Sequence, residues 1–304
     1  MRTDFNGYGL YTFGEGALRV SVTDLGATAV RVVFQGKDMI LGYDNAPDYL
    51  SHGGKLGATC GRYANRIGGA AFTLDGQTYR LTANDGENTL HSGPDAFDRQ
   101  RWAAEELANG VRFTALSPDG SNGFPGNVRA AVTYTVTGDT LRIDFEGETD
   151  KPTVYAPTNH MYFTLGGSGS VLDAALQVSA GHYLAVDSGN IPTAVTPVED
   201  TPFDFRALRR VGQDYDHCWA LDGEAACVME RDGVRLALTT DFPGVQVYTA
   251  VHLHEPFTPN QGLAIEPEFF PDSPNRPDFP DTTLRPGEHF HRWAEYRFTE
   301  ISGE

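Results

Sequence analysis

The chain has 304 residues, of which 40% are hydrophobic and 21% charged, and this composition allows a large core and excludes an intrinsically disordered protein. Its 41 acidic and 23 basic residues give a formal net charge of -18, which argues against nucleic acid and anionic membranes as partners. Three cysteines without C-x-x-C spacing indicate neither a disulfide framework nor a zinc site, and with no apolar leader or long apolar run we expect a cytoplasmic protein.

Alternating apolar and polar residues predict β-strands along most of the chain. Leu141, Ile143 and Phe145 alternate with charged residues, which places the apolar side chains on one face of a half-buried strand. The same period of two occurs at residues 18–22, 128–136 and 225–250. Turn sequences separate such runs, at Asp75-Gly76, Gly138-Asp139 and Asp232-Gly233. Because no long amphipathic helix is evident, we predict an all-β sandwich or barrel in which residues 1–304 form a single domain.

The segment from Glu255 to Pro286 is rich in Pro, Asp and Asn. It also contains four phenylalanines, at positions 257, 269, 270 and 279. Since buried rings would anchor such a segment, we expect an ordered loop and not a linker.

Residues 159–165 have the sequence Asn-His-Met-Tyr-Phe-Thr-Leu and are predicted to form one strand. Alternation then places Met161 and Phe163 in the core, and His160, Tyr162 and Thr164 on the opposite face. A histidine on a polar face can exchange protons near neutral pH. A hydrogen-bonded surface histidine is the competing explanation for this segment.

Two further segments place polar side chains near strand ends. In residues 263–268 a short apolar run ends at Glu266, which the following proline holds in an extended conformation. Partial burial would raise the pKa of this carboxyl and make it a stronger base, whereas an ordinary loop glutamate is the competing explanation. In residues 242–249 a Pro-Gly turn opens a strand with Gln246 and Tyr248 on one face, which suits sugar hydroxyls or simple cross-strand packing.

Other polar clusters contain Asn65 and Arg66 in the glycine-flanked residues 61–69, His91 in residues 90–93, and Asp216 in residues 214–218. Neither a phosphate-binding loop nor a G-x-S-x-G nucleophile elbow occurs, so nucleotide binding and an α/β-hydrolase lack support. We expect no metal at the two His-x-His pairs, although their spacing would allow one: His252 with His254, and His289 with His291.

Taken in this order, the segments resemble the galactose mutarotase (aldose 1-epimerase) family. Residues 61–67 are similar to its G-R-x-A-N-R-I signature, 159–165 to N-H-x-Y-F-N-L, 243–249 to P-G-V-Q-x-Y-T, and 266–275 to E-P-Q-x-x-P-D-x-x-N. The resemblance spans roughly residues 53–276. It implies a large antiparallel β-supersandwich with its site on one sheet face.

The resemblance also implies an enzyme that interconverts the α and β anomers of a free aldohexose such as galactose or glucose, with no cofactor. Glu266 would be the general base on the anomeric hydroxyl, and His160 the general acid that protonates the ring oxygen. The positions that would bind the sugar are Asn65, Arg66, His91, Tyr162, Asp216 and Gln246.

Three departures from the family pattern put the substrate preference in doubt. Ser92 replaces a glycine, Thr164 replaces an asparagine, and Glu268 stands where the family usually has glutamine. If Glu268 lies near Glu266, the two carboxyls would titrate as a coupled pair and change the pH range of activity.

Other functions are compatible with the sequence. A same-fold epimerase acting on another or a phosphorylated sugar would need arginines around the cleft, for which Arg62 and Arg66 are the candidates. A non-catalytic sugar-binding sandwich would keep the hydrogen-bonding groups without the chemistry, and a glycosidase would need two carboxylates at its centre. In every case the expected partner is a small sugar, and the protein could be a monomer or a homodimer.

Overall fold

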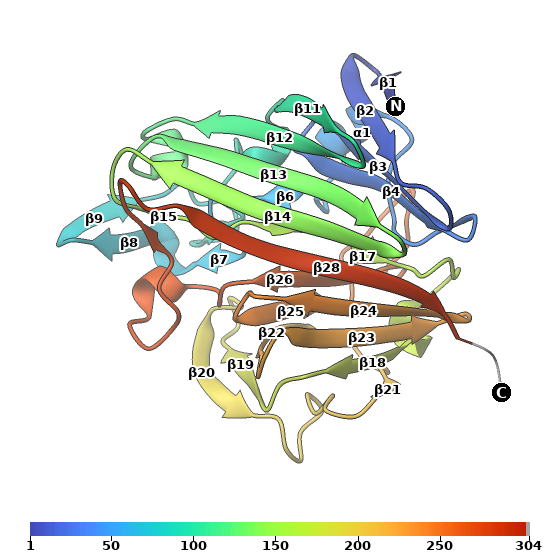
Figure 1. Cartoon of the computed structure of the whole chain (residues 1–304). Helices are drawn as coiled ribbons and strands as arrows, with labels where there is room; N and C mark the ends of the chain where they lie inside the picture. Colours follow the sequence, from blue (N-terminus) through green and yellow to red (C-terminus); the bar gives the residue numbers. More distant parts are fainter. Residues whose placement is uncertain (302–304) are drawn as a thin grey trace.

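The protein is seen in a computed structural model that describes residues 1–301, and strands dominate it (Figure 1). Within these residues the one α-helix is the short α1 (Ala46–Ser51), and no helix is long and apolar enough to cross a membrane. Five single turns of 3-10 helix connect strands: Gly68–Ala70, Phe97–Arg99, Ser121–Gly123, Val171–Asp173 and Ser273–Asn275. The prediction of an all-β fold is confirmed.

The longest strands form a nine-stranded antiparallel sheet. In spatial order its strands are β11 (Ala103–Leu107), β12 (Gly110–Ser117), β13 (Val128–Thr137), β14 (Thr140–Thr149), β28 (Phe290–Glu300), β24 (Val234–Thr240), β23 (Ala225–Arg231), β18 (Ala175–Val178) and β21 (Arg209–Arg210). The last strand of the chain, β28, therefore lies in the middle of this sheet, between β14 and β24 (Figure 1).

A six-stranded sheet forms the second layer. Its order is β17 (Tyr162–Phe163), β26 (Leu263–Glu268), β25 (Gly244–Tyr248), β22 (Asp216–Ala220), β19 (His182–Val186) and β20 (Pro192–Pro197). An N-terminal sheet follows chain order: β1 (Arg2–Phe5), β2 (Tyr8–Phe13), β3 (Leu18–Thr23), β4 (Thr28–Phe34) and β5 (Lys37–Asp38). Four pairs complete the structure: β6 (Thr59–Cys60) with β16 (Thr158–Asn159), β7 (Arg66–Ile67) with β10 (Thr89–Leu90), β8 (Ala71–Leu74) with β9 (Gln77–Arg80), and β15 (Thr153–Val154) with β27 (Thr283–Leu284).

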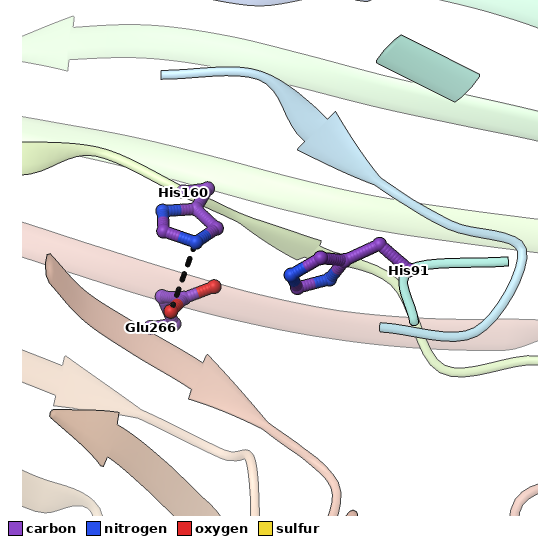
Figure 2. A group of neighbouring side chains, drawn as sticks. All are labelled: His91, His160 and Glu266. Carbon is purple, nitrogen blue, oxygen red and sulfur yellow. Dashed lines mark ion pairs between the residues drawn. The ribbon is translucent and has the colours of Figure 1, made fainter. Parts of the chain in front are cut away.

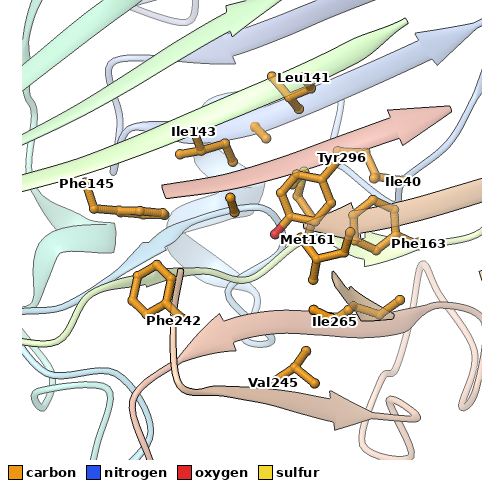
Figure 3. Packing of buried hydrophobic residues seen from close by; sticks show 14 of the residues in the cluster. Ile40, Leu141, Ile143, Phe145, Met161, Phe163, Phe242, Val245, Ile265 and Tyr296 are labelled. Carbon is orange, nitrogen blue, oxygen red and sulfur yellow. The ribbon is translucent and has the colours of Figure 1, made fainter. Parts of the chain in front are cut away.

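The predicted period of two places the core between the two large sheets. Leu141, Ile143 and Phe145 of β14 are fully buried, as the alternation predicts. They face Val245 of β25 and Ile265 of β26 across the sandwich (Figure 3). Ring contacts join the layers, with Phe163 and Tyr296 at 5.4 Å and Phe145 and Phe242 at 5.7 Å between centroids. The six-stranded sheet thus buries one face and leaves its other face for a polar site.

The hairpin turns are where the sequence predicts them. Asp75-Gly76 and Asp232-Gly233 have φ values of 50°, 79°, 47° and 80°, so both residues of each pair are left-handed. Two-residue hairpin loops need this backbone because its twist matches that of the paired strands, and Asp-Gly adopts it at low cost.

Two sequence-based expectations are wrong in detail. Residues 159–165 do not form one strand, because β16 pairs with β6 while β17 pairs with β26, and the chain leaves one sheet and enters another at His160 and Met161. The segment 255–286 is ordered, but it is not a loop throughout, since it contains β26, a central strand of the second sheet.

Candidate active site

One cleft is lined by all eight residues that the family resemblance implies for catalysis or sugar binding. It lies on the face of the six-stranded sheet that points away from the nine-stranded sheet, and it measures about 680 Å³ including its open mouth. The residues that line it are Gly54, Lys55, Asn65, Arg66, Leu90, His91, His160, Tyr162, Asp216, Gln246, Tyr248, His252 and Glu266.

Strand alternation explains how the sheet contributes to the cleft. Gln246 of β25 pairs directly with Glu266 of β26, so both side chains project from the same face. Their neighbours Val245 and Ile265 project from the other face and belong to the core. The strands that fix the two polar side chains are therefore held by the packing behind them.

His160 and Glu266 both line the cleft, and their side chains point toward each other (Figure 2). The His160 Nε2 and Glu266 Oε1 atoms are 3.5 Å apart, and the exposed fractions of the two side chains are 8% and 3%. His160 occupies the interval between β16 and β17, where its backbone N–H donates to Ala58 O. Tyr162 stacks on its ring at 4.7 Å between centroids. These contacts hold the imidazole against the carboxyl.

Burial changes the protonation of this pair. It lowers the pKa of His160 to about 3, because a charged imidazole is poorly solvated there. Burial raises the pKa of Glu266, and the neighbouring carboxyl of Glu268 raises it further. Burial therefore favours the neutral imidazole and the protonated carboxyl. His160 Nδ1 and Glu266 Oε2 are buried and accept or donate no hydrogen bond within the described structure.

His91 is the second histidine of the cleft, and its ring lies edge-on to His160 at 5.4 Å between centroids (Figure 2). Its Nδ1 accepts a hydrogen bond from the backbone N–H of Asn65 at 3.1 Å. We infer from this bond that the neutral ring carries its proton on Nε2, which makes it a hydrogen-bond donor. Burial lowers the pKa of His91 well below its ordinary value, and the nearby His160 adds to the effect.

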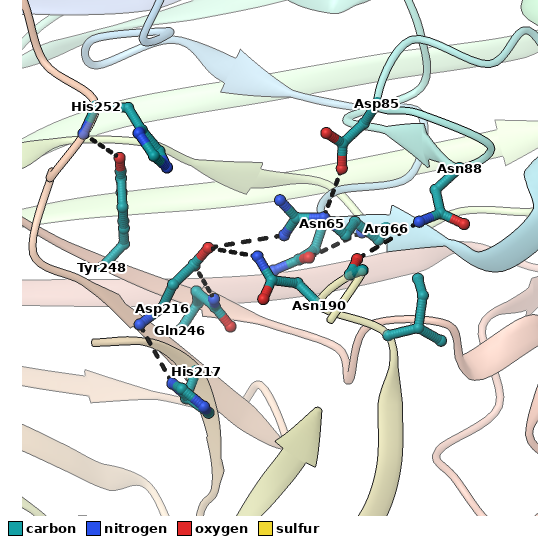
Figure 4. Close-up of polar contacts among 12 residues, drawn as sticks. Asn65, Arg66, Asp85, Asn88, Asn190, Asp216, His217, Gln246, Tyr248 and His252 are labelled. Carbon is teal, nitrogen blue, oxygen red and sulfur yellow. Dashed lines mark hydrogen bonds and ion pairs between the residues drawn. The ribbon is translucent and has the colours of Figure 1, made fainter. Parts of the chain in front are cut away.

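Polar contacts fix the side of the cleft formed by β7, β22 and β25 (Figure 4). Arg66 Nε donates to Asp85 Oδ2 at 2.7 Å, and its Nη1 lies 3.8 Å from Asp216 Oδ2. Gln246 Nε2 donates to Asp216 Oδ1 at 2.7 Å, and Asn190 Nδ2 donates to Asp216 Oδ2 at 3.2 Å. This network presents an amide, a carboxylate and a guanidinium in fixed orientations, which is a mixed set of donors and acceptors suited to hydroxyls.

Several residues of the site are not in the sequence-based set. Lys55 and His252 line the cleft from loops that carry no motif, and Tyr248 lines it from β25. Asp85 and Asn190 hold Arg66 and Asp216 from loops of their own. Of these, strand alternation already predicts Tyr248 beside Gln246 on a face suited to sugar hydroxyls, and His252 stands out in the sequence only for its spacing to His254.

Two residues considered from the sequence lie elsewhere. Thr164 does not line the cleft, because its backbone N–H donates to Met39 O at 2.8 Å and its hydroxyl donates to the backbone oxygen of Asp38 at 3.3 Å. Arg62 is also absent from the cleft lining, and its guanidinium donates to backbone oxygens that include Pro125 O and Gly126 O. It is therefore wrong as a candidate for binding a sugar phosphate in this cleft.

Possible metal ligands also gather at the site. In residues 1–301 the one group of three is His91, His160 and Glu266, whose ligand atoms lie within 4.8 Å of one another. A metal bound there would occupy the lone pairs that proton transfer needs. The pair His289 and His291 lies on the outer face of the nine-stranded sheet, where its members contact Glu146 and Asp144.

The fold and the cleft together define a sandwich protein of the mutarotase class. An aldose epimerase homologue from C. elegans superposes with a TM-score of 0.94 at 30% identity, covering 97% of this chain and all of that one. A galactose 1-epimerase from Lactobacillus acidophilus NCFM gives 0.91 at 29% identity, covering 99% of this chain and 97% of that one.

Sequence relatives are consistent with the structural neighbours. The aldose 1-epimerase of Escherichia coli K12 is 38% identical over 316 aligned positions, covering 92% of this chain and 91% of that protein. The galactose mutarotase of Mus musculus is 38% identical over 292 positions, covering 87% and 85%. The family model described as Aldose 1-epimerase matches residues 9–297. The chain belongs to the aldose 1-epimerase family, as its motifs predict.

Proposed function

We propose that this protein is a mutarotase that interconverts the α and β anomers of a free aldohexose such as galactose or glucose. The observation that carries the proposal is the buried pair of His160 and Glu266, 3.5 Å apart, in a cleft lined by hydrogen-bonding groups. An imidazole next to a carboxyl can move a proton onto one sugar oxygen and off another. Membership of the aldose 1-epimerase family supports the same reaction.

In the proposed mechanism Glu266 removes the proton of the anomeric hydroxyl while His160 donates a proton to the ring oxygen, and the C1–O5 bond breaks. The open aldehyde rotates about C1–C2. His160 then takes back the proton from the O5 hydroxyl as O5 attacks C1, and Glu266 returns its proton to O1. The closing step begins with a neutral His160 and a protonated Glu266, the state that burial favours in the cleft.

Binding of the sugar would make the opening step possible. Opening requires an ionised Glu266 and a protonated His160, so the proton of Glu266 must first pass to His160, whose Nε2 lies 3.5 Å from Glu266 Oε1. Glu266 Oε2 has no hydrogen-bond partner in the described structure, and a sugar hydroxyl that donated to it would favour the ionised carboxylate. The residues proposed to hold the sugar are Asn65, Arg66, His91, Tyr162, Asp216 and Gln246, all of which line the cleft. His91, with its proton on Nε2, would donate to a sugar oxygen.

The electrostatics of the cleft favour a neutral sugar over a phosphorylated one. The two cationic side chains that line it are already paired, Arg66 with Asp85 at 2.7 Å and Lys55 with Asp98 at 2.7 Å. A phosphate would have to break one of these pairs and would also face Asp216 and Glu266. Because like charges repel strongly where water is excluded, a phosphorylated substrate is disfavoured.

The proposal also includes the organisation expected from the sequence. We propose one domain, since the family match extends over residues 9–297, and a cytoplasmic enzyme that needs no cofactor. Both a monomer and a homodimer are compatible with this arrangement.

Polarimetry of freshly dissolved α-D-glucose and α-D-galactose tests the proposal. The wild-type protein should accelerate the change in rotation, and His160→Ala and Glu266→Gln should each lower kcat by about a hundredfold or more if these groups transfer protons. Circular dichroism should show that both variants are folded. Activity that survives both substitutions would contradict the assigned roles, and the absence of acceleration with either sugar would contradict the reaction on these substrates.

A p-nitrophenyl glycoside provides the control for the glycosidase alternative. Glycosidases place two carboxyl groups on either side of the bond they cleave. In this cleft the partner of Glu266 is His160, so we expect no release of nitrophenol from the galactoside or the glucoside. Release at a rate that Glu266→Gln abolishes would favour the glycosidase.

A further inference from the structure

Glu268 is a buried carboxyl next to the proposed base that the mechanism above does not use. It follows Glu266 by two positions in β26, so both side chains project from the same face of the strand. The exposed fractions of the two residues are 1% and 2%. Glu268 does not line the cleft itself, but Asn65, which donates to it, does.

The hydrogen bonds of the two carboxyls are incomplete. Glu268 Oε1 accepts from Asn65 Nδ2 at 2.9 Å, while its Oε2 is buried without a partner in the described structure. Glu266 has the same deficit at its own Oε2. A buried carboxylate is stable only where donors or cations surround it, so this environment does not favour two ionised groups.

The cations near the pair are engaged elsewhere. Arg66 favours ionisation of both carboxyls, but it already contacts Asp85 and Asp216. Asp216 itself adds negative charge close to both. The other titratable groups that face the two carboxyls come from several elements, and burial favours the uncharged form of each: Cys60, Tyr63, His91, His160, Tyr162, Cys218, Tyr248 and Tyr296.

We propose that Glu268 is a positioning residue whose carboxyl is coupled to that of Glu266, so that at most one of the two is ionised near neutral pH. Through this coupling Glu268 sets the pH above which Glu266 is ionised and can act as a base. Two carboxyls in one site resist double ionisation because the second charge must form beside the first. Burial raises the pKa of Glu268 to about 8, despite its hydrogen bond to Asn65.

Through its hydrogen bond with Asn65, the charge of Glu268 can affect other residues of the site. Asn65 joins Glu268 through its side chain and His91 through its backbone N–H, and its Oδ1 accepts from the backbone N–H of Arg66. A charged Glu268 would strengthen the bond from Asn65 Nδ2, whereas a neutral one would weaken it. Three residues proposed to hold the sugar are therefore connected to the carboxyl pair.

The first test is the pH dependence of kcat/KM in Glu268→Gln, and this kinetic arm rests on the proposed function. The substitution is nearly isosteric, and its amide oxygen can still accept from Asn65. Because the like charge is removed, Glu266 should ionise more easily, and the acid limb of kcat/KM should move to lower pH by about one unit or more. Glu148→Gln, on the outer face of β14 with a side chain that is 64% exposed, is the matched control and should leave the limb unchanged.

Each result of this assay discriminates. A purely structural role for Glu268 would lower kcat/KM by the same factor at every pH, and Glu268→Ala, which removes the acceptor of Asn65, is expected to add such a uniform loss. An acid limb at the same pH in wild type and Glu268→Gln would overturn the proposal.

A second test does not depend on catalysis. Infrared titration resolves the C=O band of protonated carboxyl groups, and the last such band to disappear as the pH rises should belong to the pair. In Glu268→Gln that midpoint should move to lower pH by about one unit or more, and in Glu266→Gln the remaining Glu268 should shift in the same direction, because coupling between two sites is reciprocal. Midpoints unchanged in both variants would overturn the proposal even if mutarotase activity is found. A shift without any activity would keep the coupled pair and reject the function.

Discussion

Arg62→Met should destabilise the protein substantially while leaving the cleft intact. Arg62 is 2% exposed, and its guanidinium donates to the backbone oxygens of three buried residues: Ser117 at 3.1 Å, Pro125 at 2.7 Å and Gly126 at 3.0 Å. Methionine fills much of the same space but donates no hydrogen bond. A buried carbonyl that loses its donor costs about 1 kcal/mol or more, so three of them predict a loss of about 3 kcal/mol.

The assay is urea and thermal unfolding followed by circular dichroism. For a protein of this size, about 3 kcal/mol corresponds to a decrease in Tm of roughly 5 °C. The control is Arg285→Met, which breaks an exposed pair with Asp75 and should cost much less, because solvent screens such a pair. If Arg62→Met unfolds no earlier than Arg285→Met, the three carbonyls do not depend on Arg62 and the reasoning is wrong. The folded variant should keep its kcat/KM, because Arg62 does not line the cleft.

Three further predictions concern the site. Gln246→Leu should raise KM about tenfold in a polarimetric rate series, since it removes the 2.7 Å bond to Asp216 and a donor for the sugar; an unchanged KM would contradict the binding role. Thr164→Val should leave kcat/KM within about twofold of wild type, because its side chain faces away from the cleft; a large loss would contradict that placement. The folded-state pKa of Glu268, about 8, exceeds its ordinary value of 4.5, so its contribution to stability is complete below pH 4.5 and is lost as the pH rises to 8. In Glu268→Gln the free energy of unfolding, measured by denaturation at several pH values, should decline less steeply over this range, by up to about 1.4 kcal/mol per pH unit. An identical slope in wild type and variant would contradict this prediction.

Alternation of side chains made much of the fold predictable. Residues 141–146 and 245–248 show a period of two without interruption, and the structure sorts them onto core and polar faces as expected. The ordered family motifs then identified eight residues that the structure brings to one cleft. Their roles in catalysis and binding stay predictions until they are measured.

Features that depend on distant partners were not predictable in this way. Residues 159–165 have the alternation of a single strand, but the first part of this segment pairs with β6 and the later part pairs with β26, so the strand is interrupted at His160. The buried state of Glu268 depends on Asn65 and on packing behind the cleft, and no local pattern encodes it. The engagement of Arg62 by Ser117 and by residues 125 and 126 likewise has no counterpart in the sequence around Arg62.

The way the cleft is assembled bears on how the protein folds. Asn65 and Glu268 are hydrogen-bonded although they are 203 positions apart, and β28 reaches the middle of its sheet only after nearly the whole chain is available. Long-range antiparallel pairing of this kind forms slowly, because large loops must close before their contacts stabilise them. During refolding, the proposed mutarotase activity should therefore return only after secondary structure has formed. It should then report when the native state is complete.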